Sequence, residues 1–211
     1  MKIKICGITN IEDAQLAVAL GATHIGLNFY PKSPRYITKQ KALDITGSIR
    51  QLATPPVIVG IFVNKSEKSI RTTIKDTGLD LAQLHGDEPH TLIKNLGKLA
   101  YKAYRLGKDN IPSQIPQLCL VDAYVKGKYG GGGTTTDWEK AALIAKKTHV
   151  FLAGGLTPEN ISEAIKHVQP WGVDVASGVE SEPGIKDPNK IQRFIENTIH
   201  SIQHYNINDD V

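Results

Sequence analysis

Two residues of this chain have the type and the position to do chemistry, Cys6 and Asp122. Cys6 ends a short β-branched run and shares one face of it with Lys4, because side chains alternate along a strand. Asp122 ends the otherwise apolar run 118–121, where packing alone does not explain a carboxyl group. Partial burial raises a carboxyl pKa, so the group holds a proton at neutral pH, as a general acid must. These positions predict a catalytic thiol and a catalytic acid.

The cation beside Cys6 favours a role for its thiol. A nearby ammonium group lowers a thiol pKa from its reference of about 8.5, and Lys4 lies one layer below Cys6. Cys119 is the internal comparison, since strand alternation points it away from Asp122 and towards the helices, where we expect a structural role. Two simpler interpretations stay open: Cys6 as a small buried hydrophobe, and Asp122 as a cap on backbone amides of the loop that follows it.

Two glycine-containing turns predict where an anion binds. Gly154 and Gly155 follow the seventh predicted strand, and Ser177 and Gly178 follow the eighth. Glycine lets backbone N–H groups approach an anion, and a short helix that starts near Ser177 directs its positive end towards it. Loops after strands seven and eight commonly hold phosphate in barrel enzymes. We therefore predict a phosphate site here; the alternative is that both glycine clusters only form turns.

Three further residues are predicted to contact a substrate: Arg35, His85 and Asp174. Arg35 lies in a proline-rich loop, and a guanidinium group binds a carboxylate through two parallel hydrogen bonds. His85 ends the fourth predicted strand, and Asp174 lies near the end of the eighth. The alternatives are a solvated surface arginine and a histidine that only supports the site.

Other conspicuous residues predict neither a metal site nor a nucleotide motif. The chain has seven histidines, and His200 and His204 lie one helical turn apart without a third ligand or an HExxH context. We therefore predict no metal and no cofactor. The glycine run 130–133 lacks the Gly-Lys-Ser/Thr of a nucleotide-binding loop, and its predicted role is a mobile rim loop that closes over substrate.

Eight apolar segments alternate with helical segments and position these residues. The predicted strands cover residues 2–6, 24–29, 57–63, 79–85, 99–104, 118–122, 149–153 and 172–175. The predicted helices cover residues 11–20, 38–52, 67–76, 88–95, 138–147 and 189–200, with one more opened by residues 157–159. Ser66 and Asp137 are predicted N-caps, as is Thr9 or Asn10.

Near-continuous apolar strands that alternate with helices indicate a parallel sheet covered by helices. Eight units of roughly 25 residues predict a single (β/α)8 TIM barrel of class α/β, with a doubly wound open sheet as the alternative. Pro112 and Pro116 predict a poor or missing helix in the fifth connection.

Composition sets the wider limits. The chain has 211 residues, of which 40% are apolar and 22% charged, and we predict one domain over residues 1–211 with a frayed tail at 203–211. Two cysteines argue against a disulfide framework and favour a reducing cytoplasm. The chain opens on a strand rather than on a secretion signal, and no apolar run is long enough to span a membrane.

The net charge of +4 is mild, and the lysines are scattered along the chain. This pattern argues against nucleic acid as a partner and is compatible with an anionic small-molecule substrate drawn to a basic rim. We expect a monomer or a homodimer.

The motifs, taken together, resemble those of the phosphoribosylanthranilate isomerases of tryptophan biosynthesis. The resemblance runs from the first strand to the last and is carried by KICGIT at 4–9, NFYPKSPRY at 28–36, QLHG at 83–86, Asp122 with YGG at 129–131, DW at 137–138, AGGLTPEN at 153–160 and VDVASGVE at 173–180. Thr136 and Ala176 depart from the family pattern, which usually has an aromatic residue and a serine at these positions, and the glycine run is longer than is typical.

The resemblance implies a (β/α)8 barrel that converts N-(5'-phosphoribosyl)anthranilate to 1-(2-carboxyphenylamino)-1-deoxyribulose 5-phosphate by an Amadori rearrangement, without a cofactor. It implies that Cys6 is the general base, that Asp122 is the general acid and that Arg35 binds the anthranilate carboxylate. It also implies that the phosphate loops are those of Gly154, Gly155, Ser177 and Gly178.

Two other functions stay open. A related sugar-phosphate barrel isomerase, such as the ProFAR isomerase of histidine biosynthesis, uses aspartates at the ends of strands one and six, and Cys6 speaks against it. A phosphate-ligand binder without catalysis keeps Gly155 and Ser177 but has no need of Cys6 or Asp122.

Overall fold

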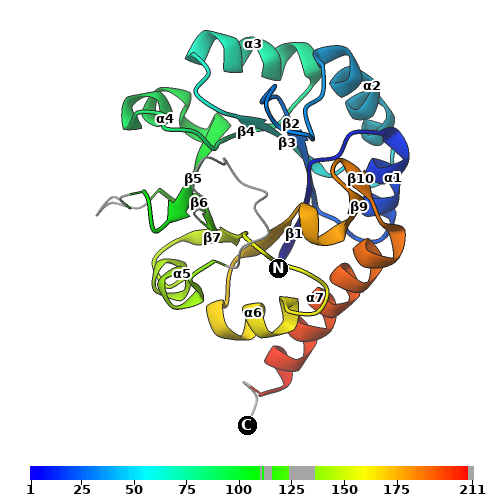
Figure 1. The fold of residues 1–211 in the computed structure, drawn as a ribbon, viewed down its shortest axis with the longest axis vertical. Coiled ribbons are helices and arrows are strands. Elements are labelled where there is room, and N and C mark those ends of the chain that lie inside the picture. The colour runs from blue at the N-terminus through cyan, green and yellow to red at the C-terminus, as the bar shows by residue number, and fades with distance from the viewer. Residues whose placement is uncertain (110, 112–115, 124–135, 209–211) are drawn as a thin grey trace.

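The strands of this protein close into a barrel (Figure 1). The computed structural model describes residues 1–109, 111, 116–123 and 136–208, with side chains described as far as residue 201. Eight parallel strands pair in chain order, and the last pairs with the first: β1 Lys2–Cys6, β2 His24–Asn28, β3 Val57–Phe62, β4 Leu81–Leu84, β5 Ala100–Leu106, β6 Leu118–Ala123, β7 His149–Leu152 and β8 Gly172–Val175. The predicted TIM barrel is confirmed, and closure excludes the open sheet.

Helices surround the barrel (Figure 1): α1 Ile11–Ala19, α2 Lys39–Arg50, α3 Glu67–Thr77, α4 His90–Leu96, α5 Trp138–Ala145, α6 Ile161–Val168 and α7 Pro188–Asn208. Four of them begin after a side chain that accepts a hydrogen bond from a backbone N–H three residues on, namely Asn10, Thr38, Ser66 and Asp137. The N-caps predicted at Ser66 and Asp137 are confirmed, and Asn10 rather than Thr9 caps α1. The described part of the connection between β5 and β6 contains no helix, as its prolines predict.

Two elements differ from the prediction. Helix α7 continues to Asn208, so the predicted helix end at His200 is wrong. The frayed tail at 203–211 stays a prediction, and residues 209–211 lie outside the described part. Its sequence after Pro188 holds no glycine or proline to end the helix. A small antiparallel hairpin, β9 Glu180–Glu182 and β10 Ile185–Lys186, follows β8 and was not predicted.

Buried side chains pack on both faces of the barrel strands. The inward face carries a compact cluster: Val59, Tyr101, Ala103, Leu120, Phe151 and Ala153. The larger cluster joins the outward face to the helices and includes Cys119, which is fully buried. The outward direction predicted for Cys119 is confirmed, and burial raises the pKa of its thiol to about 12.

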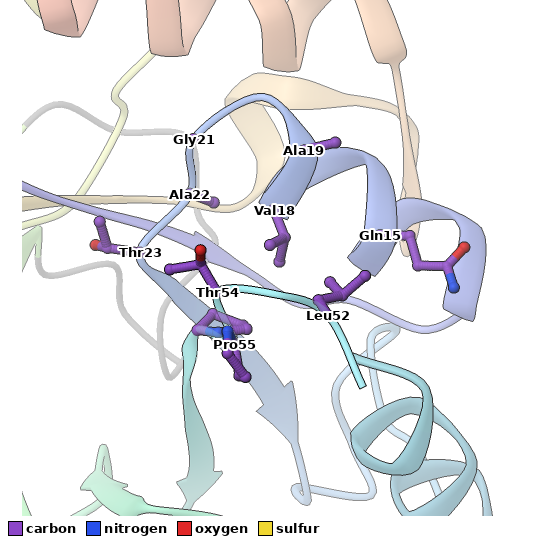
Figure 2. Close-up of a pocket in the computed structure, with 10 residues that line it drawn as sticks. Gln15, Val18, Ala19, Gly21, Ala22, Thr23, Leu52, Thr54 and Pro55 are labelled. Atoms are coloured by element: carbon purple, nitrogen blue, oxygen red, sulfur yellow. The ribbon is translucent and has the colours of Figure 1, made fainter. Parts of the chain in front are cut away.

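A pocket of about 470 Å³ lies at the end of the barrel where strands begin (Figure 2). Its walls come from α1 and from the segments just before β2 and β3, and include Val18, Ala22, Leu52 and Pro55. Cys6 and Asp122 lie at the opposite ends of their strands, so this pocket is not the predicted site. Residues at this end of a TIM barrel usually serve stability. Within the described ranges, no helix has the length and apolarity to cross a membrane.

Candidate active site

The carboxyl ends of the strands bring the predicted residues to one rim of the barrel, in two groups. On what we call the Cys6 side, β1 pairs with β8 so that Lys4 and Asp174 lie at neighbouring positions below Cys6. On what we call the Asp122 side, formed by β4 to β6, the Nε2 atom of His85 lies 3.2 Å from Oδ2 of Asp122.

Lys4 and Asp174 form an ion pair inside the barrel. Lys4 Nζ donates to Asp174 Oδ1 at 2.8 Å, and the lysine has no exposed surface. Burial by itself lowers the pKa of Lys4, but the carboxylate of Asp174, with smaller contributions from Cys6 and Tyr101, outweighs it and raises the pKa. Lys4 is therefore a permanent cation, and one oxygen of Asp174 is already bound by the protein.

Burial raises the pKa of the Cys6 thiol above its ordinary value. The cations of Lys4 and Lys186 act in the opposite direction, and the carboxylate of Asp174 adds to the effect of burial. The lowered pKa predicted for Cys6 is therefore wrong for the protein as it stands. Strand alternation identified the cation, but it does not measure desolvation and does not reveal the carboxylate that offsets the cation.

Arg35 is buried and paired, so it is not a solvated surface residue. Its Nε and Nη2 atoms donate to the two carboxylate oxygens of Glu180 at 2.7 and 2.6 Å. Lys186 Nζ donates to Glu180 Oε1 at 2.9 Å and to the backbone oxygens of Cys6 and Ala176 at 2.7 and 3.1 Å. This cluster ties the loop after β2, the β9–β10 hairpin and the end of β1 together.

The charges of this cluster depend on one another. Hydrogen bonds to Glu180 raise the pKa of Arg35. Burial raises the pKa of Glu180, but Arg35 and Lys186 outweigh it and the net pKa is lowered. Sequence reasoning missed Glu180 and Lys186. The Pro-Gly pair at 183–184, with Glu180 before it and Lys186 after it, was the available signal for a hairpin with a cross-strand ion pair.

Asp122 stands at the end of a series of buried side chains that are joined by short polar contacts. Tyr101 Oη lies 2.9 Å from Gln83 Oε1, and Gln83 Nε2 lies 2.9 Å from His85 Nδ1. The second oxygen of Asp122, Oδ1, accepts a hydrogen bond from the N–H of Ala123 at 2.8 Å. One oxygen of Asp122 thus binds a backbone amide of its own strand, while the other faces His85; the loop that it was predicted to cap lies largely outside the described residues.

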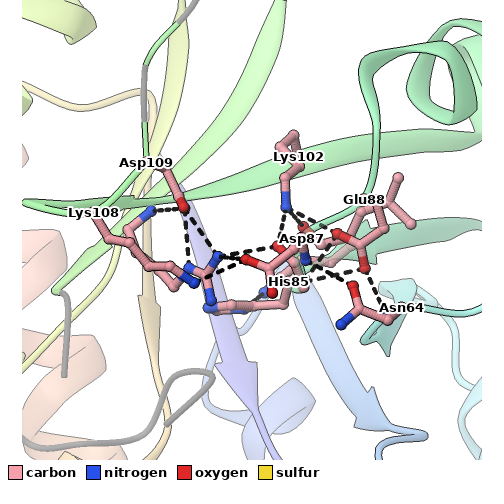
Figure 3. A network of polar contacts seen from close by, with 11 residues as sticks. Asn64, His85, Asp87, Glu88, Lys102, Lys108 and Asp109 are labelled. Atoms are coloured by element: carbon pink, nitrogen blue, oxygen red, sulfur yellow. Dashed lines mark hydrogen bonds and ion pairs between the residues drawn. The ribbon is translucent and has the colours of Figure 1, made fainter. Parts of the chain in front are cut away.

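An ion-pair network holds the loop that follows His85 (Figure 3). Both carboxylate oxygens of Glu88 accept from the N–H of Gly86, and Glu88 Oε1 also accepts from the N–H of Asn64. Lys102 Nζ donates to Glu88 at 2.9 Å and to the Gly86 carbonyl at 2.7 Å. The loop backbone is therefore fixed by a side chain of the loop itself, Glu88, and by Lys102 from β5.

Arg105 reaches the same loop from the end of β5. Its Nη2 atom donates to the Gly86 carbonyl at 3.2 Å, to Asp87 at 2.7 Å and to Asp109 at 3.0 Å. Sequence reasoning assigned no role to Arg105, Lys102 or Glu88, because their partners come from different strands.

Comparison with known proteins now identifies the family. The family model described as "N-(5'phosphoribosyl)anthranilate (PRA) isomerase" matches residues 3–197. The N-(5'-phosphoribosyl)anthranilate isomerase of Aquifex aeolicus is 45% identical to this chain over 204 residues, covering 94% of this chain and 98% of that protein. The chain belongs to the PRA isomerase family. It is an isomerase of tryptophan biosynthesis, as its motifs suggested.

Solved structures of PRA isomerases share the fold. The enzyme from Thermotoga maritima is 36% identical, with a TM-score of 0.82 and coverage of 95% of this chain and 99% of that one. A second PRA isomerase, 33% identical with a TM-score of 0.79 and the same coverage, was solved in complex with reduced 1-(o-carboxyphenylamino)-1-deoxyribulose 5-phosphate.

In this isomerase the two glycine turns lie against each other. Gly154 and Gly155 have φ values of +86° and +64°, which favour glycine. A Cβ atom on Gly154 would approach Asp122 Oδ1 to 2.9 Å, and one on Gly178 would collide with the carbonyl of Leu156. The turn after β7 therefore contacts both Asp122 and the turn after β8. Phosphate binding by these turns stays a prediction.

Thr136 takes the place of the aromatic residue usual in PRA isomerases, and it has a structural partner. Its Oγ1 donates to the carbonyl of Ala153 at 2.6 Å, next to Gly154. Among the described residues, no three His, Cys, Asp or Glu side chains gather as metal ligands would. The glycine run 130–133, for which a closing role is predicted, lies outside the described residues.

Proposed function

We propose that this isomerase converts N-(5'-phosphoribosyl)anthranilate to 1-(2-carboxyphenylamino)-1-deoxyribulose 5-phosphate, with Asp122 as general acid and Cys6 as general base. The observation that supports this proposal most is that Cys6 and Asp122 both occupy inward-facing positions at the carboxyl ends of barrel strands, on the same rim. The solved relative that holds a reduced carboxyphenylamino-deoxyribulose phosphate supports the substrate class.

The first step opens the ribose ring. Asp122 gives its proton to the furanose ring oxygen, the bond between that oxygen and C1 breaks, and the nitrogen lone pair forms a C1=N bond. The product is an open-chain, protonated Schiff base, and Asp122 is left as a carboxylate. The N–H of Ala123, which already donates to Oδ1, stabilises that carboxylate.

The second step moves a proton from C2. The Cys6 thiolate removes it, the electron pair forms the C1=C2 bond, and the cationic nitrogen takes up the electrons to give an enolamine. The enolamine gains a proton at C1 and loses one from the C2 hydroxyl, which gives the ketone. Lys4 and Lys186 favour the thiolate, and the positive Schiff base adds a third cation when the base is needed.

The substrate's two anions have separate partners in this proposal. Glu180 holds the Nε and Nη2 atoms of Arg35, so the Nη1 side of the guanidinium is the one that binds the anthranilate carboxylate. The phosphate binds to backbone N–H groups of the turns at Gly154–Gly155 and Ser177–Gly178. His85 and Asp174 line the space between.

The test is turnover of freshly generated phosphoribosylanthranilate, followed by loss of its fluorescence, without added metal or cofactor. We expect the wild type to react and both Cys6→Ala and Asp122→Asn to lose at least about 100-fold in kcat, as removal of an acid or base does. Cys119→Ala is the matched control, because its thiol packs against the helices, and its kcat should stay near that of the wild type.

The outcomes separate the alternatives. Phosphate-ligand binding without turnover by the wild type would establish a silent binder. Turnover that survives Cys6→Ala would keep the reaction and overturn the choice of base. We also propose that the enzyme acts in a reducing cytoplasm, since both of its cysteines are free. We further propose that it is a monomer or a homodimer.

A further inference from the structure

Three buried side chains lead to Asp122, and the mechanism above gives no role to two of them, Tyr101 and Gln83. Tyr101, Gln83, His85 and Asp122 come from three adjacent strands or their ends, and none is more than 6% exposed. Successive polar atoms along the series lie 2.9, 2.9 and 3.2 Å apart. A continuous polar series inside a barrel has to be satisfied at every atom, which restricts the protonation of each member.

The donor at the first contact is the tyrosine. Tyr101 Oη faces the oxygen of the Gln83 amide, and two oxygens at 2.9 Å require a hydrogen between them. Burial raises the pKa of Tyr101, so the phenol keeps its proton and donates it. In this orientation of the amide, Oε1 faces Tyr101 and the NH2 group of Gln83 faces His85.

The amide orientation then decides the tautomer of His85. An amide NH2 group only donates, so Nδ1 of His85 accepts the contact at 2.9 Å and carries no proton. The single proton of the neutral imidazole therefore lies on Nε2. Nε2 points towards Asp122 Oδ2 at 3.2 Å but outside hydrogen-bond geometry, and it has no other partner among the described residues.

We propose that Tyr101 and Gln83 are positioning residues that hold His85 as the neutral Nε2–H tautomer beside Asp122. The inference rests on the proposed function for the role of Asp122 as acid. An imidazolium next to Asp122 would stabilise its carboxylate and oppose the proton donation that opens the ring. The Gln83 NH2 group prevents this, because protonated Nδ1 would set two donors against each other.

Two groups that can carry charge lie close to His85. Asp122 faces it from β6, and Arg105 approaches the loop after it from β5. The guanidinium of Arg105 is balanced by ion pairs with Asp87 and Asp109. The neutral Nε2–H group is left as a donor towards Asp122 and the substrate oxygen.

Nitrogen-15 NMR of the imidazoles in the labelled, full-length wild type tests the tautomer directly. Long-range proton–nitrogen correlations distinguish a ring nitrogen that carries a proton from one that does not, and the signals missing from His85→Gln assign His85 among the seven histidines. We expect Nδ1 without a proton and Nε2 with one near neutral pH. A protonated Nδ1, in the other tautomer or in the imidazolium, would overturn the proposal.

Two variants test what holds the tautomer. Tyr101→Phe removes the donor that orients the amide, so we expect His85 signals intermediate between the two tautomers. Gln83→Glu replaces the NH2 donor with an acceptor, so we expect protonation of Nδ1. Tyr104→Phe is the matched control, because this tyrosine belongs to the outer cluster of the same strand, and His85 signals should not change. Unchanged signals in both test variants would refute the positioning role.

Kinetics connect the tautomer to the reaction. Gln83→Glu should lower kcat by about 10- to 100-fold and leave KM within about twofold, because it alters proton transfer rather than binding. Unchanged kcat in a variant with protonated Nδ1 would also overturn the proposal. Failure of the proposed function looks different: the wild type would not turn over phosphoribosylanthranilate, while its His85 signals would still show the Nε2–H tautomer.

Discussion

The polar groups nearest to Cys6 and those that lead to Asp122 differ in charge. On the Cys6 side the nearest polar groups are charged: Lys4 with Asp174, and Arg35 and Lys186 with Glu180. On the Asp122 side the series that leads to the carboxyl group runs through the uncharged Tyr101 and Gln83 to His85, which we propose is neutral.

The difference matches what each group does in the proposed reaction. A thiol must lose its proton, and fixed cations help it to do so. A carboxyl group that donates a proton is better placed beside neutral dipoles, since a cation would stabilise its anion. The barrel separates the thiol and the carboxyl group by placing them on different strands, so each has its own surroundings.

The largest expected effect comes from a substitution that breaks the ion pair on the Cys6 side. Asp174→Asn leaves the ammonium group of Lys4 buried without a counter-charge, and we expect it to lower the free energy of unfolding by about 3–5 kcal/mol. Urea denaturation measures it. The double variant Lys4→Met/Asp174→Asn should recover most of the loss, because it removes the uncompensated charge. A loss in the single variant of less than about 1 kcal/mol would contradict the assignment.

Glu180→Gln should lower the free energy of unfolding by a smaller amount, about 2–3 kcal/mol near pH 7, since it weakens charged hydrogen bonds to Arg35 and Lys186. The folded pKa of Glu180 lies below its ordinary 4.5, so its contribution is complete above that value and is lost as the pH falls through the folded pKa. Urea denaturation from about pH 7 to about pH 3 should show the difference from wild type shrinking. Glu182→Gln, an exposed neighbour, is the control; a difference that grows in acid would exclude this linkage.

Disturbing the series from Tyr101 to His85 should cost less unfolding free energy than breaking the ion pairs on the Cys6 side. Tyr101→Phe removes one neutral hydrogen bond and leaves Gln83 Oε1 without its donor, so we expect a loss of about 1–2 kcal/mol in unfolding free energy. Tyr101→Phe/Gln83→Leu should cost less than the sum of the single variants, because the two share a contact. A loss as large as that of Asp174→Asn would remove the contrast between the two sides.

The smallest expected effect is on thiol titration. The alkylation rate of Cys6 by iodoacetamide, followed by mass spectrometry in a Cys119→Ser background, should still rise with pH above the ordinary thiol value of 9.0. Lys4→Met should move the midpoint upward, because it removes a cation that favours the thiolate. A downward shift would mean that Lys4 does not act on Cys6.

Sequence reasoning predicted the barrel, the inward direction of Cys6 and Asp122, and the outward direction of Cys119, because these depend on the local alternation of a strand. It identified Lys4 as the cation near Cys6, but it did not predict the partners that come from other strands. Gln83 and His85 were both inside a recognised motif, yet their link to Tyr101 depends on pairing between β4 and β5. The pKa direction of Cys6 was wrong for the same reason.

The sequence by itself determined the order of elements, the caps at Ser66 and Asp137, and which side chains face the barrel axis, because each follows from interactions within a few residues. Only the tertiary structure decided which charged side chains form ion pairs with one another. Lys4 and Asp174 lie 170 positions apart and meet because β8 closes the barrel against β1. Desolvation and long-range Coulomb interactions exist only after that closure, and they set the protonation of the site.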